Sequence, residues 1–473
     1  MKKEMPFWMA IIPLAVMIVT MAFAVIVFEQ DPHIPLLVGT AAAAIVAALS
    51  GYKWKDIEEF MYKGIRLALP AVVIIMLVGA TIGAWIGGGV VATLIYYGLK
   101  IISPSLFLVT ITIICGIVSL SIGSSWSTMG TIGVAGMGIG LSMGVPAPMV
   151  AGAIISGSYF GDKMSPLSDT TILASGLTNT DLFEHIRHMF YTTIPGLAIA
   201  LTAYFFLGKN AASTGLDSSD IQGTIASLQE NFVISPLLLI VPVLVIVMVA
   251  RKVPAIPALA AGIFLGFLSQ IFIQGGHVGD AFGTLFSGYS IESGNETVDE
   301  LFNAGGLESM MYTVSLAMIA MTFGGVLEHT GMLQAIVKQI LKFAKTTGRL
   351  IASTVLSCFV TNVTCAEQYI SIVVPSRMYA SIFREKRLHS KNLSRALEDG
   401  GTLTSVFTPW NTCAVFILGT LGVHAFEYAP YAILNYAVPV ISIIYAFTGW
   451  TIVKLPETKA LALEKEEKTS ANA

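Results

Sequence analysis

The sequence predicts an all-α membrane protein that crosses the bilayer many times. Of its 473 residues, 55% are hydrophobic and only 12% are charged, and the mean hydropathy is +0.77. A water-soluble core cannot bury that much apolar surface. Apolar runs of about 17 to 25 residues, the length that spans a hydrocarbon core as a helix, recur along the chain. We expect about twelve spanning or partly spanning segments.

The apolar runs extend from the first residues to the last. Examples are 7–28, 69–85, 106–120, 232–250 and 428–453. The first run follows Lys2 and Lys3, but it is too long for a signal peptide and has no small-residue cleavage site, so it is expected to be a first span. Two shorter apolar pieces, 148–158 and 413–421, predict re-entrant hairpins because they are too short to span.

Clusters of Lys and Arg predict which ends lie in the cytoplasm, because the positive-inside rule counts these residues in short loops. The clusters lie at residues 2–3, 53–66, 187, 251–252, 338–349, 384–395 and in the tail. Segments 29–35, 208–231 and 275–306 hold few basic residues and are expected outside. The resulting division is a first half at 1–207, an extracytoplasmic connector at 208–232, a second half at 233–453 and a cytoplasmic tail at 454–473. Both termini are then cytoplasmic.

On this count the first half begins inside and the second begins outside, so the two halves are expected to be inverted repeats. Matching motifs support the idea. Ser165-Pro166-Leu167-Ser168 is answered by Thr408-Pro409-Trp410-Asn411, and a polar stretch precedes each proline at a similar distance, at 119–131 and 361–371. Such polar, proline-containing breaks are tolerated at membrane depth only where protein or a water-lined cavity satisfies the backbone. Broken helices of inverted repeats meet at a substrate site near the midplane.

The run GSYFGDKMSPLSDTT, residues 157–171, holds the most informative charges. Asp162, Lys163 and Asp169 lie in apolar surroundings, where carboxylates are costly and are seldom accidental. A hard cation such as Na⁺ prefers several oxygen ligands. We therefore expect Asp162 and Asp169 to bind Na⁺. The neutral residues expected to line the site are Ser124, Ser125, Thr128, Ser165, Ser168, Thr170, Thr408 and Asn411.

Structural roles for these acids stay open at this point. Asp162 could pair with the adjacent Lys163, and Asp169 could cap a helix that begins at Thr170. In the second half Glu367 is the expected partner acid, because burial disfavours a charged carboxylate and lets a proton compete with a cation. Its alternative is a pair with Arg377 or a place at the membrane edge.

Other polar residues are expected to be peripheral. Glu398 and Asp399 lie near a predicted segment end and are expected at the membrane interface. His185 and His188 flank Arg187 in an amphipathic stretch, where a solvated face is the favoured interpretation over pH sensing. The four cysteines have no CxxC spacing and are expected to pack in the interior.

These motifs resemble the NhaC family of bacterial Na⁺/H⁺ antiporters, which also includes malate/lactate antiporters coupled to Na⁺ and H⁺. The resemblance rests on GSYFGDKMSPLSDTT together with GSSWSTMGTIG upstream and the later TCAEQY and FTPWNTCA segments. It implies a secondary transporter of the ion-transporter superfamily type, built from inverted repeats with hairpins and without a covalent cofactor. By position Asp162, Ser165, Asp169, Thr170 and Glu367 match the motifs of the family. Ile172 departs from the TTNLA pattern of many members, which bears on the solute.

The expected function is Na⁺/H⁺ exchange across a bacterial cytoplasmic membrane by alternating access. The alternative is a malate or lactate exchanger in which Lys163 and Arg377 help to hold the anion. The expected partners are the lipid bilayer, the transported Na⁺ and H⁺, and in the alternative an organic acid. No basic stripe supports nucleic-acid binding, and no HExxH or suitably placed GxSxG motif supports an enzyme. The sequence leaves a homodimer and the transport stoichiometry open.

Overall fold

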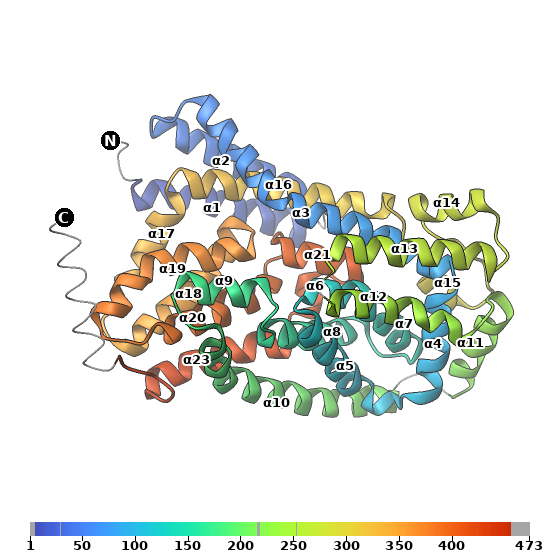
Figure 1. Ribbon diagram of the computed structural model, residues 1–473. Coiled ribbons are helices and arrows are strands. Elements are labelled where there is room, and N and C mark those ends of the chain that lie inside the picture. The colour runs from blue at the N-terminus through green and yellow to red at the C-terminus, as the bar shows by residue number, and fades with distance from the viewer. Residues whose placement is uncertain (1–4, 29, 215–217, 252, 456–473) are drawn as a thin grey trace.

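The structure, a computed structural model, describes residues 5–28, 30–214, 218–251 and 253–455, and these residues are almost entirely helical (Figure 1). The first-half α-helices are α1 (Phe7–Met21), α2 (His33–Leu49), α3 (Trp54–Gly87), α4 (Val90–Ile101), α5 (Phe107–Ile122), α6 (Ser125–Thr128), α7 (Val134–Ser142), α8 (Ala147–Met164), α9 (Asp169–Leu177) and α10 (Leu182–Thr214). The later ones are α11 (Ser218–Asn231), α12 (Ile240–Ala250), α13 (Ala255–Phe272), α14 (Val278–Ser287), α15 (Glu296–Phe302), α16 (Met311–His329), α17 (Met332–Leu341), α18 (Thr347–Cys365), α19 (Gln368–Glu385), α20 (Ser390–Leu397), α21 (Thr412–Leu421), α22 (Ala425–Tyr428) and α23 (Ile433–Thr448). Short 3₁₀ or π segments are η1 (Ala22–Val27), η2 (Pro104–Leu106), η3 (Met129–Gly133), η4 (Pro236–Leu239), η5 (Glu308–Met310), η6 (Glu398–Thr402) and η7 (Ser405–Phe407).

Seven helical segments of the described chain are long and apolar enough to cross a membrane, and eight if the bent pair 222–231 and 236–249 counts as one span. Five further apolar helices have only 10–17 residues. The number of full-length spans is therefore smaller than the twelve spanning or partly spanning segments expected. The apolar piece at 148–158 is not a short hairpin arm, because it lies inside the 18-residue helix α8. The piece at 413–421 does form a short helix, α21.

Two helices stop abruptly at a left-handed residue and restart after one extended residue. α5 ends at Gly123, with φ of 76°, and α18 ends at Ala366, with φ of 57°. The residues that follow, Ser124 and Glu367, are both extended, with φ of −152° and −146°. The side chain of each accepts a hydrogen bond from the backbone three residues later, which caps the next helix.

The two proline motifs also share one backbone conformation. Ser165 and Thr408 have φ/ψ of −81°/131° and −98°/110°. Ser168 and Asn411 have −72°/133° and −72°/143° and precede α9 and α21. In both turns the last residue donates its N–H to the carbonyl of the first, at 3.3 Å and 2.8 Å. Proline disfavours helical backbone at the residue before it, and Ser165 and Thr408 are accordingly extended.

All of these matched positions are 243 residues apart, as 123 is from 366 and 165 from 408. The same offset relates contacts between helices. Ser119 donates to the carbonyl of Ser158 at 2.6 Å, and Asn362 donates to that of Gly401 at 2.7 Å. The segments 107–177 and 350–420 therefore repeat one local architecture.

The two matched segments enter the middle of the molecule from opposite ends. Helix α10 lies along one side of the molecule, so contacts with its two ends show where each segment begins (Figure 1). The chain just before α5 packs at Ser105 against Gly208, near the end of α10. The first turn of α18 packs at Gly348 against the end of α23. Thr451, three residues after α23, contacts His188 near the start of α10.

Candidate functional site

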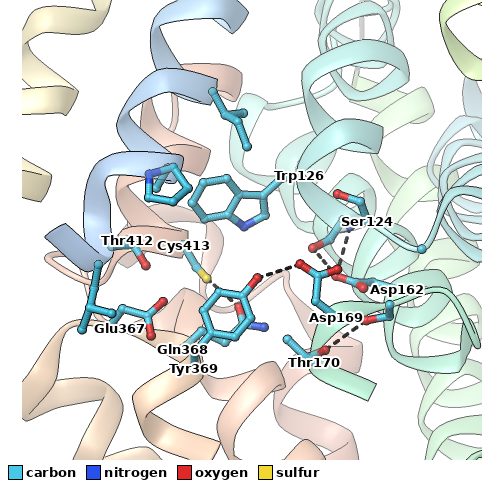
Figure 2. Close-up of a pocket in the computed structure, with 17 residues that line it drawn as sticks. Ser124, Trp126, Asp162, Asp169, Thr170, Glu367, Gln368, Tyr369, Thr412 and Cys413 are labelled. Carbon is cyan, nitrogen blue, oxygen red and sulfur yellow. Dashed lines mark hydrogen bonds between the residues drawn. The ribbon is translucent and has the colours of Figure 1, made fainter. Parts of the chain in front are cut away.

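A cavity of about 450 Å³ lies where the broken helix ends meet. Figure 2 shows Glu367 on one side of it and Asp162 and Asp169 on the other, with Trp126 and Tyr369 between them. The residues that line it are Leu67, Pro70, Ala71, Ile74, Gly123, Ser124, Ser125, Trp126, Asp162, Ser168, Asp169, Thr170, Glu367, Gln368, Tyr369, Thr412 and Cys413. α3 supplies the apolar wall, and the breaks supply the polar groups.

Most of the polar lining consists of pairs related by the 243-residue offset. The pairs are Ser124 with Glu367, Ser125 with Gln368, Trp126 with Tyr369, Asp169 with Thr412, and Thr170 with Cys413. The cavity thus lies between the two matched segments, and equivalent positions face it from both. The members of a pair differ in charge, however. Glu367 corresponds to the neutral Ser124, and Asp169 corresponds to the neutral Thr412.

Asp162 lies in the last turn of α8 and is only 7% exposed. Its Oδ2 accepts hydrogen bonds from the hydroxyl of Ser125 at 2.6 Å and from the backbone N–H of Ser125 at 3.1 Å. The end of α8 and the start of α6 therefore hold the carboxylate in one orientation at the cavity wall. The alternative of a pair with adjacent Lys163 is wrong, because Lys163 forms a buried ion pair with Asp399 instead.

Asp169 is the first residue of α9; it is exposed and lines the cavity. Its Oδ2 accepts a hydrogen bond of 2.9 Å from the hydroxyl of Tyr369. The expected capping role is not observed: the helix begins at Asp169 itself, and Ser168 occupies the cap position. The Ser168 hydroxyl instead lies 3.1 Å from that of Thr170, and both face the cavity.

Glu367 is 6% exposed and lies at the tip between α18 and α19. It accepts a hydrogen bond of 3.0 Å from the backbone N–H of Ile370, so it caps α19 while it faces the cavity. A carboxylate is favoured at a helix N-terminus by the free N–H groups and the helix dipole. Arg377, its suggested partner, is exposed on the same helix, whereas Glu367 is buried and bonded to the backbone of α19.

Four residues expected in the lining lie outside it. Thr128 donates to the carbonyl of Ser124 within its own helix. Ser165 accepts the N–H of Leu167 inside the proline turn. Asn411 caps α21 and donates to Asn362, and Thr408 is buried at the start of the second proline turn. These residues stabilise the helix breaks, so they hold the cavity-lining residues in place without lining the cavity themselves.

The electrostatic character of the cavity follows from its lining. Three carboxylates face it, and none of the described residues that line it is Lys, Arg or His. The described residues contain no cluster of three or more His, Cys, Asp or Glu side chains arranged to hold a transition metal. The site is therefore an acidic, partly aromatic cavity suited to a positively charged solute.

Comparison with known proteins assigns the family. The profile of the Na⁺/H⁺ antiporter family matches residues 3–159 and 157–450. The Na⁺/H⁺ antiporter NhaC of Alkalihalophilus pseudofirmus is 39% identical over 95% of this chain and 97% of that protein. The chain belongs to the NhaC family of Na⁺/H⁺ antiporters. It is a multi-pass membrane antiporter and not an enzyme.

Relatives of this antiporter differ in their solutes. The malate-2H⁺/Na⁺-lactate antiporter of Bacillus subtilis is 38% identical over 93% of this chain and 94% of that protein. The arginine/ornithine antiporter ArcD of Halobacterium salinarum is 35% identical over 96% and 95%. A solved structure, that of Neisseria gonorrhoeae MtrF, covers 90% of this chain and 96% of that chain at 14% identity, with a TM-score of 0.41. Family membership alone therefore does not name the solute.

Several cavity residues of the antiporter were not among the predicted ones. Trp126 stacks on Phe416 with ring centroids 4.3 Å apart, and Gln368 accepts a hydrogen bond from the Cys413 thiol at 2.7 Å. Tyr369 holds Asp169. A signal for Gln368 and Tyr369 was present, because they follow Glu367 at the offset that relates them to Ser125 and Trp126. The apolar wall from α3 had no such signal.

Two expectations about peripheral polar residues are wrong. Glu398 and Asp399 are fully buried rather than interfacial, and His185 and His188 are buried rather than solvated. Helix α10 packs its histidine-bearing face against α20, so the amphipathic pattern marks a polar interior contact. The four cysteines are buried, as expected.

Proposed function

We propose that this antiporter exchanges Na⁺ for H⁺ across a bacterial cytoplasmic membrane at the cavity between its two matched segments. The observation that carries the proposal is the charge of the lining: three carboxylates and, among the described lining residues, no cationic side chain. Asp162 and Asp169 bind the cation. The hydroxyl groups of Ser124, Ser125 and Thr170 are the neutral ligands. Glu367 carries a proton or couples its movement to that of the cation.

Exchange follows from competition for the same negative charges. Ionised carboxylates in a closed, water-poor site are costly, so the empty, charged site does not occlude readily. A bound Na⁺ or a bound proton removes this cost. Only the loaded forms then pass between the inward-open and outward-open arrangements, and the gradient of one ion drives the other.

We further propose that the halves 1–207 and 233–453 are inverted repeats whose relative movement provides alternating access. The 243-residue equivalence of the breaks, the shared turn conformations and the opposite directions of entry support this assignment. The basic clusters support a topology with both termini in the cytoplasm and the 208–232 connector outside.

The volume of the cavity favours a second candidate, an organic cation. A volume of about 450 Å³ falls in the range of small-molecule sites and exceeds the need of one bare ion. Trp126 and Tyr369 could face an ammonium or guanidinium group, and one relative is an arginine/ornithine antiporter. The malate or lactate alternative, suggested by another relative, has less support here, because Lys163 is paired with Asp399 and Arg377 is exposed elsewhere.

Proteoliposomes with an imposed pH gradient separate these candidates. Labelled Na⁺, malate, lactate and arginine are offered one at a time, with Asp169→Asn as the control that keeps shape but removes one charge. We expect pH-driven Na⁺ uptake without any organic solute and its loss in the control. An absolute requirement for malate, lactate or arginine would overturn the Na⁺/H⁺ proposal, and full activity of the control would remove Asp169 from the site.

A further inference from the structure

Glu398 is a buried carboxylic acid outside the lining of the cation cavity. Its side chain has no exposed area, and neither carboxyl oxygen has a hydrogen-bond partner among the described residues. An ionised carboxylate buried without hydrogen bonds is strongly disfavoured. A protonated carboxyl group avoids most of that penalty, so burial favours the neutral form.

The local backbone is unusual at this position. Glu398 begins η6, a π-helical turn that interrupts the run from α20 to η7. The adjacent Gly400 and Gly401 lie close against α18 and α19, where an added methyl group would collide with Val355 and with Ser371. Glu398 and Asp399 are consequently both directed into the interior. Single π-helical turns of this kind are frequent at functional sites.

The positive charges around Glu398 favour its ionised form, whereas burial favours its neutral form. Lys163 donates a hydrogen bond to Oδ1 of Asp399, and Nε of Arg395 lies 4.0 Å from Oδ2 of the same carboxylate. Two buried cations thus share one anion. The uncompensated positive charge favours an ionised Glu398, so small changes nearby can decide its protonation state.

Glu398 also communicates with the cavity. The titratable and charged groups around Glu398 and Asp399 are Asp162 and Lys163 of α8, Cys358 of α18, Arg395 of α20 and, beside Lys163, His185 of α10. Arg395 in turn is faced by His188 of α10 and Tyr445 of α23. The hydroxyl of Thr170 neighbours Glu398 and also lines the cavity. Lys163, which follows Asp162, is paired with Asp399, which follows Glu398. The charge of Asp162, which we propose binds Na⁺, therefore acts on Glu398 across packed neighbouring elements.

We propose that Glu398 is a proton-binding site of this antiporter, separate from the cation cavity and coupled to it through Asp162 and Thr170. The inference rests on the proposed exchange of a cation for protons. A cation bound at Asp162 cancels negative charge near Glu398, and Lys163 and Arg395 then favour release of its proton. When the cation leaves, the charge of Asp162 returns and the proton is taken up again.

Two flux measurements on the purified full chain in proteoliposomes test this role. Exchange of labelled for unlabelled Na⁺ at equal pH needs no proton, whereas Na⁺-driven H⁺ movement does. We expect Glu398→Gln to keep Na⁺/Na⁺ exchange and lose Na⁺-driven H⁺ movement. Glu385→Gln, which changes an exposed acid of α19, serves as the control and should keep both. Unaltered H⁺ movement with an unaltered pH profile in Glu398→Gln would overturn the proposal.

A second variant and a second readout cover failure of the first. If Glu398→Gln does not fold, Glu398→Asp retains an acid and should move protons with a shifted pH profile; an unshifted profile would count against the proposal. Infrared difference spectroscopy detects a protonated carboxyl group without any transport. We expect its band at neutral pH, diminished by Na⁺ and absent in Glu398→Gln. If wild-type protein moves no protons with Na⁺, the proposed function fails, while a missing band would by itself reject Glu398.

Discussion

The hydroxyl of Tyr369 donates a hydrogen bond of 2.9 Å to Oδ2 of Asp169, which lies 200 positions earlier in the chain. The equivalent aromatic residue of the first segment, Trp126, stacks on Phe416 of α21. Trp126 and Tyr369 occupy equivalent positions, and each contacts the short helix of the other segment, α21 and α9 respectively. Any relative movement of the two segments has to change these two contacts, whereas the Ser125–Asp162 bond lies within one segment.

Tyr369→Phe should weaken Na⁺ binding and leave the protein folded. The substitution keeps the ring in the cavity but removes the hydroxyl that holds the Asp169 carboxylate in one orientation. A lost hydrogen bond of about 1 kcal/mol raises the Na⁺ concentration for half-maximal exchange by roughly fivefold. A pH-sensitive dye in everted vesicles measures exchange against Na⁺ concentration, and Tyr436→Phe, in the first turn of α23 with its hydroxyl on the carbonyl of Pro430, is the control. An unchanged half-maximal concentration would mean that the hydrogen bond does not influence ion binding.

Asp162→Asn should abolish Na⁺-dependent flux without loss of folding. The amide oxygen can still accept the two hydrogen bonds from Ser125, so the contact between helix end and hairpin tip is kept. The negative charge that binds the cation is removed. The matched control is Ser405→Ala, at the equivalent position of the second segment, which does not line the cavity. Retained Na⁺ flux in Asp162→Asn would place the cation elsewhere.

Ala366→Gly should raise stability, because Ala366 is a non-glycine residue with φ of 57°. Left-handed backbone costs an L-residue roughly 1–2 kcal/mol, and glycine avoids that cost, although part of the gain is offset by the entropy of the unfolded chain. The reverse change at the equivalent place, Gly123→Ala, should destabilise, since its φ is 76° and an added methyl group would collide with Leu167. Thermal unfolding of the purified variants in detergent measures both. Equal unfolding midpoint temperatures for the two variants would contradict the shared left-handed geometry at the ends of α5 and α18.

Cysteines at positions 222 and 385 should be labelled from opposite sides of the membrane. Gln222 of α11 and Glu385 of α19 are exposed, and Figure 1 places α11 and the connection from α19 to α20 at opposite ends of the molecule. The four natural cysteines are buried and are replaced in the background. An impermeant maleimide applied to intact cells should reach only position 222. Labelling of both positions from outside would be incompatible with the proposed topology.

Much of the local architecture could be predicted because it depends on nearby residues. Pro166 and Pro409 disfavour helical backbone at the residue before them, and the polar residues Ser168 and Asn411 occupy the cap positions of the next helices. Other prolines, such as Pro70 and Pro375, lie inside helices, so proline alone does not fix a break. The match between the two proline motifs was visible in the letters alone. The number of full-length spans was less predictable, since helix length and breaks depend on packing as well as on hydropathy.

Composition and capping residues act locally, so the letters alone predict a helical membrane protein with two related polar breaks. Which distant groups meet depends on the folded chain. The tertiary structure paired Lys163 with Asp399 rather than with its neighbour Asp162, and it buried Glu398 beside them. Whether a charge is paired, solvated or isolated depends on the segments that fold against it, and these lie more than two hundred residues away in the chain.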